Sequence, residues 1–166
     1  MQALLQRVDS AMLGYVVRLG LYLAAFTFAL ERLTAGPTEA LKQATAALTA
    51  ALLWPFSDAV SRDGDVVSYA GFSVRIIEEC FGLLEMAIFA AAVLAFAAPW
   101  RARAVGLAAG LPAIYAFNLL RIAMLLVVGR HAPAWFDFAH LYFWQATLIL
   151  VITGFWLLWL RFVVRA

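Results

Sequence analysis

The chain has 166 residues, of which 66% are hydrophobic and 13% are charged, and its formal net charge is +2. Soluble domains have about 45–50% apolar and about 25% charged residues, so this composition excludes an ordinary soluble domain and indicates an integral membrane protein. The twelve Lys and Arg residues are dispersed, without a basic patch that contains aromatic residues, which argues against nucleic-acid binding. The length suits a single membrane-embedded domain over residues 1–166.

Apolar runs predict four transmembrane helices, at residues 11–30, 81–98, 104–128 and 140–160. The first run has 20 residues, which is the number that crosses about 30 Å of hydrocarbon at about 1.5 Å per residue. Arg18 lies inside this run and must snorkel, meet water or find an acidic partner, because an unpaired charge at mid-bilayer costs at least about 2.5 kcal/mol. The predicted fold class is an all-α integral membrane protein.

The segment between the first two runs, residues 31–79, has the composition of a soluble segment. Apolar residues at helical spacing predict an amphipathic helix that lies on the membrane surface or caps the helix bundle. The predicted apolar stripe consists of Leu41, Ala44, Leu48 and Leu52.

Two short strands are predicted after this helix. The motif Arg62-Asp63-Gly64-Asp65 predicts a turn, and the apolar residues between Val67 and Ile76 predict a hairpin that folds back at Ala70-Gly71. The second strand leads directly into Cys80.

Basic residues indicate the orientation of the chain. Five arginines are concentrated in the two short terminal segments and the loop 99–103, whereas five Lys or Arg are spread over the longer segments 31–79 and 129–139. By the positive-inside rule, both termini are cytoplasmic, and Cys80, Arg121 and His140 lie toward the outer face. The five concentrated arginines are Arg7, Arg101, Arg103, Arg161 and Arg165.

Cys80 is the only cysteine, and His131 and His140 are the only histidines. A single thiol excludes an intrachain disulfide, and this set of side chains is a poor one for a structural zinc site. We therefore expect neither a metal ion nor a cofactor. Cys80 is then either a small apolar side chain in the core or a nucleophile.

The neighbours of Cys80 decide how a thiolate could form there. The start of a helix stabilises a negative charge through free N–H groups, and Gly82 permits close approach of an extended substrate. Glu78 and Glu79 disfavour a second negative charge, so a thiolate at this position needs a nearby cation.

Arg121 is the predicted cation, and Asn118 lies one helical turn before it on the same face. The guanidinium group of arginine can hold a thiolate, a peptide carbonyl or a developing oxyanion. The alternative is an arginine that reaches out to lipid phosphate. Asn118 favours the functional interpretation, because a snorkelling arginine needs no amide beside it.

His140 is the predicted general acid or base, at the start of the fourth apolar run. Asp137 could cap this helix or orient the imidazole. The alternatives are an interfacial histidine that packs against its aromatic neighbours, and His131 as the competing base, although His131 lies beside Arg130 in a predicted loop.

Glu85 is an acidic residue inside the second apolar run, and such a residue indicates a partner or a function. Pairing with Arg18 or Arg121 would hold helices in register. We favour this structural role because Glu85 lies about 140° from Cys80 around an ideal helix.

These motifs occur in the order Cys80-Phe81-Gly82-Leu83, Asn118-Leu119-Leu120-Arg121-Ile122 and His140, at the outer ends of successive predicted helices. In this arrangement the chain resembles the exosortase and archaeosortase family, and the short exosortase H group most of all. The resemblance is densest from Glu79 to Arg161. The family usually has a small or polar residue after the cysteine, whereas this chain has Phe81.

The resemblance implies a membrane cysteine protease and transpeptidase of the bacterial cytoplasmic (inner) membrane, with a Cys, Arg, His site. Its substrates would be secreted proteins that end in a short recognition motif, a transmembrane helix and a basic tail. The acceptor would be an amine, a lipid or water. The residues alone leave a second hypothesis, a non-catalytic membrane assembly or chaperone subunit. A transporter is disfavoured because four helices show no inverted repeat.

Overall fold

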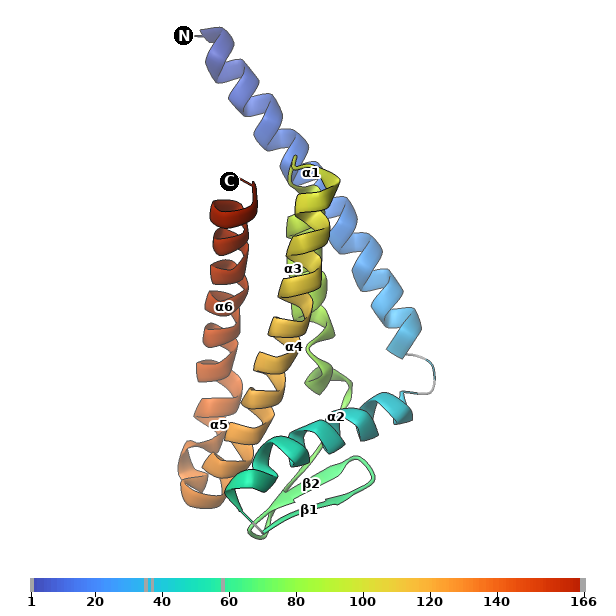
Figure 1. The fold of residues 1–166 in the computed structure, drawn as a ribbon, viewed down its shortest axis with the longest axis vertical. Helices are drawn as coiled ribbons and strands as arrows, with labels where there is room; N and C mark the ends of the chain where they lie inside the picture. Colours follow the sequence, from blue (N-terminus) through green and yellow to red (C-terminus); the bar gives the residue numbers. More distant parts are fainter. Residues whose placement is uncertain (1, 35, 37, 58, 165–166) are drawn as a thin grey trace.

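A computed structural model describes residues 2–34, 36, 38–57 and 59–164 of the chain, with side chains from residue 10 onward. The long helices run roughly parallel to the long axis, while α2 (Glu39–Leu53) and a small sheet lie across one end (Figure 1). We call this the sheet end, residues 38–81. The opposite end, where α1 begins and α6 stops, is the terminal end, residues 95–110 and 152–164.

Three helical stretches among the described residues are long and apolar enough to cross a membrane. They lie in α1 (Gln2–Thr34), in α4 (Trp100–His131) and between Pro133 and Val164. The third contains η3 (Pro133–Trp135), α5 (Phe136–Phe138), the π-helix Ala139–Phe143, α6 (Trp144–Trp159) and the π-helix Leu160–Val164. The spans predicted at 11–30, 104–128 and 140–160 are thus confirmed as helices.

The predicted loop at residues 129–139 is wrong. Helix α4 continues to His131, and helical structure resumes at Pro133, so that Ala132 alone separates the two. An apolar environment favours this arrangement, because a helix satisfies its own backbone groups where water is scarce.

Helix α3 (Leu83–Ala95) is shorter than the predicted span 81–98. Gly82, with φ +70°, separates it from the preceding turn, and Phe96 is extended, so the helix has 13 residues and covers about 20 Å. The chain nevertheless returns between the sheet end, where α1 finishes, and the terminal end, where α4 starts (Figure 1). The extended residues 96–99 lengthen this return, and a membrane crossing by α3 stays a prediction.

The sheet has three antiparallel strands in the order β1-β2-β3, namely β1 (Val60–Asp63), β2 (Val66–Tyr69) and β3 (Phe72–Arg75). The predicted hairpin with its fold at Ala70-Gly71 is confirmed, and Gly64-Asp65 forms the predicted turn. Strand β1 was not predicted because most of its side chains are polar and exposed. The fold is therefore mostly helical with a small sheet, and all-α is too narrow a description.

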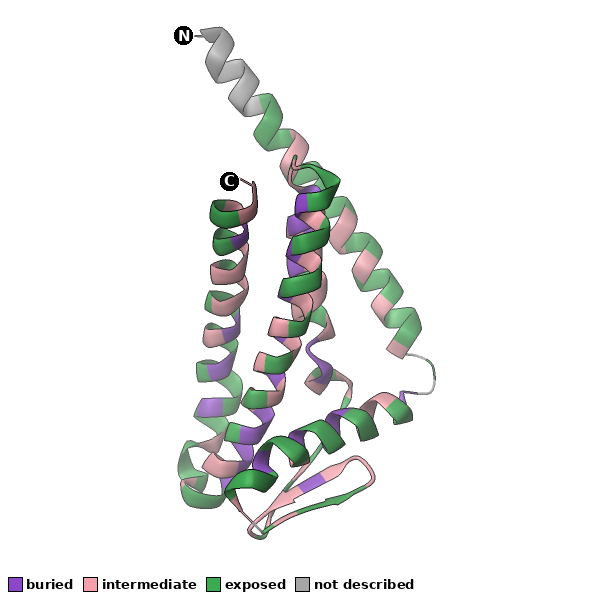
Figure 2. Ribbon diagram, viewed as in Figure 1, coloured by how far each residue is buried: buried purple, intermediate pink, exposed green. Residues whose placement is uncertain are grey.

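Helix α2 packs against α4 and against the first two strands, which confirms that it caps the bundle. The residues of the predicted apolar stripe share one face of α2, but this face is largely exposed: Leu48 and Leu52 are 48% and 39% exposed, whereas Leu41 packs against the core. The buried face instead carries Thr45, Thr49 and other small side chains, which allow close approach to α4. The outward leucines belong to a largely exposed surface (Figure 2), as expected for a helix that contacts lipid.

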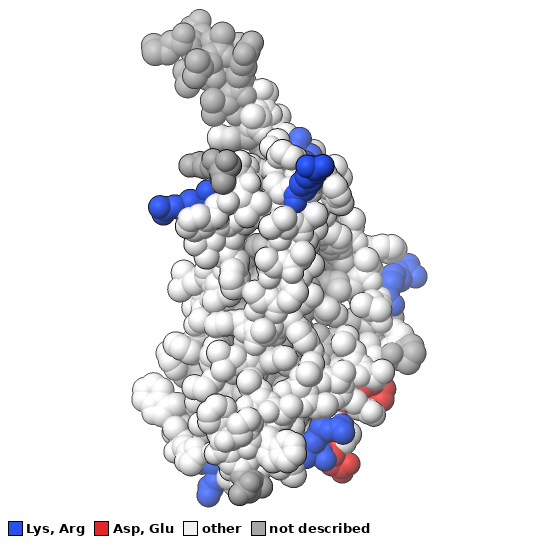
Figure 3. Space-filling view, viewed as in Figure 1, with Lys and Arg blue, Asp and Glu red and all other residues white. Residues whose placement is uncertain are grey.

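Charged side chains are unevenly placed on the surface. On the face that Figure 3 shows, the described surface over α4 and α6 carries no charge between the two ends, and acidic side chains appear only toward the sheet end. Of the five arginines that predict the orientation, Arg165 and the side chain of Arg7 lie outside the described residues.

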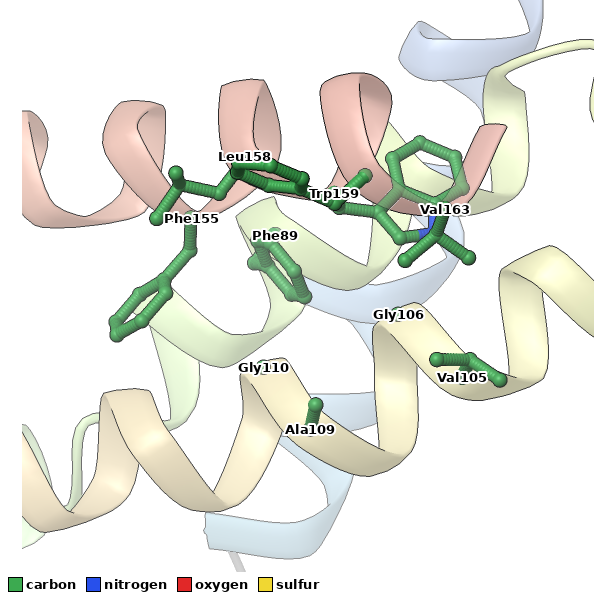
Figure 4. Close-up of a pocket in the computed structure, with 10 residues that line it drawn as sticks. Phe89, Val105, Gly106, Ala109, Gly110, Phe155, Leu158, Trp159 and Val163 are labelled. Atoms are coloured by element: carbon green, nitrogen blue, oxygen red, sulfur yellow. The ribbon is translucent and has the colours of Figure 1, made fainter. Parts of the chain in front are cut away.

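The terminal end is held by aromatic rings that pack against glycines of α4 (Figure 4). A Cβ atom at Gly106 would lie 2.6 Å from the Trp159 indole nitrogen, and one at Gly110 would lie 2.2 Å from the Phe89 ring. Beside these contacts, an apolar cleft of about 240 Å³ lies between α4 and the last helical stretch.

Arg18 donates a hydrogen bond from Nε to the Ala95 carbonyl oxygen at 2.8 Å, at the end of α3. The carbonyl end of a helix carries partial negative charge and suits a cation. The predicted ion pair between Glu85 and Arg18 or Arg121 is not present among the described residues, in which Lys42–Glu78 and Arg75–Asp65 are the ion pairs.

Candidate active site

A pocket of about 110 Å³ lies where α4, β3, the turn before α3 and the π-helix at 139–143 meet. Its polar lining comes from segments that are far apart in the sequence. The polar or ionisable lining residues are Arg75, Cys80, Asn118, Arg121 and His140, and the apolar ones are Val74, Ile77, Ile122, Leu125 and Phe136. The three predicted catalytic groups thus line one pocket.

Cys80 is half-buried in the 3₁₀ turn η2 (Glu78–Phe81), which ends at Gly82. Its backbone N–H donates to the Ile77 carbonyl at 2.9 Å. The sequence placed Cys80 at the mouth of a helix, but the structure places it in a separate turn. Gly82, in the left-handed conformation at φ +70°, makes this break possible at little cost.

Asn118 fixes the turn to α4. Its side chain is fully buried, and Nδ2 donates a hydrogen bond to the Cys80 carbonyl at 2.6 Å. A Cβ atom at Gly82 would lie 3.0 Å from Asn118 Cγ, so Gly82 also gives this amide the room it needs. The sequence predicts that Gly82 leaves room for a substrate, whereas in the structure Gly82 leaves room for Asn118. The buried Asn118 Oδ1 has no hydrogen-bond partner among the described residues.

Arg121 follows Asn118 by one turn of α4 and lines the same pocket. Its charge lowers the pKa of Cys80, but burial is the larger effect and raises this pKa, as do the charges of Glu79 and Glu78. The net shift is upward, so Cys80 at neutral pH is a protonated thiol. The site must therefore remove a proton before the sulfur can act as a nucleophile.

His140 lies in the π-helix Ala139–Phe143, and its ring is 5.7 Å from the Phe136 ring, centroid to centroid. His131, the competing base, is 6.0 Å from the Tyr69 ring and does not line the pocket. Asp137 is exposed and makes no hydrogen bond within the described part of the chain, and its charge acts on His140 through space.

Arg75 also lines the pocket, which the sequence pattern does not predict. Its Nη1 donates to both Asp65 carboxylate oxygens, at 3.0 and 3.1 Å, and so it is held at the pocket rim. The signal was present, because Arg75 belongs to the strand predicted to lead into Cys80. Glu85, which was proposed as a supporting residue, does not line the pocket.

Among the described residues, no group of three or more His, Cys, Asp and Glu side chains could hold a metal ion. The pocket is instead a set of one thiol, two guanidinium groups, one imidazole and one amide. Such a set can form a nucleophile, transfer its proton and stabilise an oxyanion.

Comparison with known proteins identifies a matching family. The family model for transmembrane exosortases (Exosortase_EpsH) matches residues 9–160. No curated protein matches the chain, and no solved structure matches it. The matched range includes the Cys80 turn and the segments that carry Arg121 and His140.

Proposed function

Because the chain belongs to the transmembrane exosortase family, we propose that it is a membrane cysteine protease and transpeptidase that cleaves C-terminal sorting signals. Family membership implies a sorting function and an integral membrane location. The substrates are secreted proteins that end in a recognition motif, a transmembrane helix and a basic tail. One observation carries the proposal: Cys80, Arg121 and His140 line a single pocket.

The first chemical step starts from the neutral thiol. His140 accepts the proton of Cys80, and the sulfur attacks the carbonyl carbon of the scissile peptide bond. Arg121 stabilises the developing negative charge, first on sulfur and then on the carbonyl oxygen. Asn118 holds the Cys80 carbonyl at 2.6 Å, so the turn stays close to the helix that carries Arg121.

The second step breaks the peptide bond. The tetrahedral intermediate collapses, His140 returns the proton to the leaving amine, and the new carboxyl end of the substrate remains as a thioester on Cys80. An acceptor amine, a lipid nucleophile or water then attacks this thioester. His140 takes the acceptor's proton and gives it to the departing sulfur, which restores the thiol.

Both termini face the cytoplasm in this proposal, and the pocket faces outward at the bacterial cytoplasmic membrane. The positive-inside rule supports this orientation. The start of α1 and the end of α6 lie toward the same end of the molecule, as expected if both termini are on one side of the membrane (Figure 1). A membrane-impermeant thiol reagent should label Cys80 in cells whose outer membrane is permeabilised, but should not label an R101C protein that carries C80A. The reverse pattern of labelling would exclude the outward orientation.

The decisive experiment is co-expression of the protein with a reporter that ends in a cognate sorting signal. C80A and C80S should both abolish processing while the protein accumulates in the membrane at the wild-type level. Normal processing by either variant would exclude the cysteine mechanism and leave the hypothesis of a non-catalytic assembly subunit.

A further inference from the structure

Glu78 is the first residue of the turn that carries Cys80, and the side chains of Lys42 and Thr38 bind the Glu78 carboxylate. Lys42 Nζ lies 2.8 Å from Glu78 Oε1. The Thr38 hydroxyl donates to the same oxygen at 2.8 Å, and Thr38 is 9% exposed. One oxygen therefore receives two hydrogen bonds, one from Lys42 of α2 and one from Thr38 directly before this helix, 40 residues before Glu78.

The two carboxylates before Cys80 are in different situations. Glu78 is paired with Lys42, and this hydrogen bond, followed by that from Thr38, lowers the pKa of Glu78 to about 2. Glu79 has no ion pair among the described residues and lines a separate hollow with Glu78 and Glu31. Helix α2 thus compensates one of the two negative charges beside the thiol.

We propose that Lys42, Thr38 and Glu78 form a latch through which α2 positions the Cys80 turn and sets the charge around the nucleophile. Within this latch Lys42 and Thr38 are positioning residues that act through Glu78. The effect on turnover rests on the proposed function, whereas the effect on the thiol can be measured without a substrate.

Several charged or titratable groups surround the thiol and must be held constant in a test. Glu78 and Glu79 belong to its own turn, Arg121 comes from α4, His140 from the π-helix and Arg75 from β3, and Lys42 reaches the turn from α2. Changes at Lys42 and Glu78 leave the other four groups in place.

The proposal predicts opposite effects for substitutions of Lys42 and of Glu78. K42Q removes a positive charge and should disfavour the thiolate, so that alkylation of Cys80 at neutral pH slows by about two- to threefold. E78Q removes a negative charge and should accelerate alkylation by a similar factor. A contact with a merely structural role would change both rates in the same direction, through exposure alone.

The experiment follows iodoacetamide alkylation of the detergent-solubilised full chain between pH 6 and pH 10, and Cys80 is the only thiol present. K42R should restore the wild-type profile, and K42Q/E78Q should lie close to it. Arg62→Gln, which removes an exposed charge of the sheet end away from the pocket, controls for loss of a charge as such. Equal profiles for all variants, or shifts of K42Q and E78Q in the same direction, would overturn the charge role of the latch.

The turnover of a sorting-signal reporter tests the positioning role separately. K42Q/E78Q keeps the net charge near the thiol but loses the charged contact, so kcat should fall about fivefold or more with little change in KM. Unchanged kcat would overturn the positioning role. If no variant or wild-type protein processes the reporter while the alkylation profiles shift as expected, the proposed function fails and the charge role stands.

Discussion

The sheet end and the terminal end of the molecule each bury an apolar cluster, but the two ends differ in the contacts that position single residues. At the terminal end, Trp159 and Phe89 pack against glycines of α4, and Figure 4 shows these rings between the helices. The sheet end has a buried apolar cluster that includes Val67 and Phe81, and polar contacts add to it, including Asn118 to Cys80 and Lys42 to Glu78. Close packing sets the spacing of whole helices, whereas directional polar contacts set the position of a single turn.

Packing of an aromatic ring against a glycine also occurs at the sheet end. A Cβ atom at Gly129 of α4 would lie 2.2 Å from the Phe72 ring of β3, so a glycine and a ring also meet at the sheet end. This contact places the strand that carries Arg75 against α4. The sheet end thus uses packing to place the sheet and polar bonds to place Cys80.

The largest expected effect concerns the positive charge of Arg121 in the pocket beside the sheet end. Arg121→Ala should lower the rate of reporter processing by about 100- to 1000-fold, because an oxyanion donor is lost. Arg121→Lys should recover only part of this rate, since lysine lacks the planar fork. The matched control is Arg130→Ala, an exposed arginine of the same helix outside the pocket. Equal losses for both alanine variants would contradict a specific role.

The hydrogen bond from Asn118 should be the next most sensitive contact. Asn118→Ala leaves the Cys80 carbonyl without this donor, and we expect processing to slow by about tenfold or more. The protein should still accumulate in the membrane. Thr49→Val is the control, because Thr49 is also fully buried and its hydroxyl has no partner among the described residues. A similar loss in Thr49→Val would point to general damage of the fold.

At the terminal end, packing is tested with glycines. Gly110→Ala should lower the free energy of unfolding in detergent by about 1–3 kcal/mol, because its methyl group would overlap the Phe89 ring. Gly154→Ala in α6 is the matched control, since its Cβ meets no atom within 4 Å. Thermal melting curves of the two variants give the comparison, and indistinguishable curves would refute the tight contact.

The hydrogen bond of Trp159 at the terminal end should contribute less to the free energy of unfolding than the packing at Gly110. Trp159→Phe removes the hydrogen bond from Nε1 to the Ala102 carbonyl at 2.7 Å and should cost about 1 kcal/mol of stability. The processing rate per folded molecule should not change, because the pocket lies at the other end of the molecule. A selective loss of turnover would mean that the two ends are coupled.

The smallest effect is a pH dependence in the wild-type protein. Burial raises the pKa of Cys80, so alkylation at neutral pH should be slower than that of an unstructured cysteine peptide. The rate should increase with pH and reach its midpoint above that of the peptide, since thiolate is the reactive form. A midpoint below that of the peptide would indicate a thiolate stabilised at rest.

Local sequence pattern predicted the long helices and the β2–β3 hairpin because each depends on neighbouring residues. The apolar run of α4 and the turn at Ala70-Gly71 are such features. The pattern predicted the helix α2 but not its buried face, because Leu48 and Leu52 face outward and Thr45 faces α4. In a membrane protein an apolar stripe can face lipid as well as a core, so periodicity alone does not choose the buried face.

In the candidate site, too, the sequence pattern predicts residues but not their contacts. Its members Cys80, Arg121 and His140 were predicted from residue type and order, while Arg75 was not. Partners within the site, such as Asn118 with the Cys80 carbonyl, are 38 residues apart. No local rule relates positions at such a separation.

The sequence by itself determined that the protein belongs in a membrane, which segments are apolar helices and in what order the reactive residues occur. Composition and short-range spacing carry this information. Only the tertiary structure decided that Lys42 meets Glu78, that Gly82 separates the Cys80 turn from α3 and that Arg75 lines the pocket with Cys80. These features depend on how helices pack over long separations, and each is a balance of burial, hydrogen bonding and steric fit that short segments do not contain.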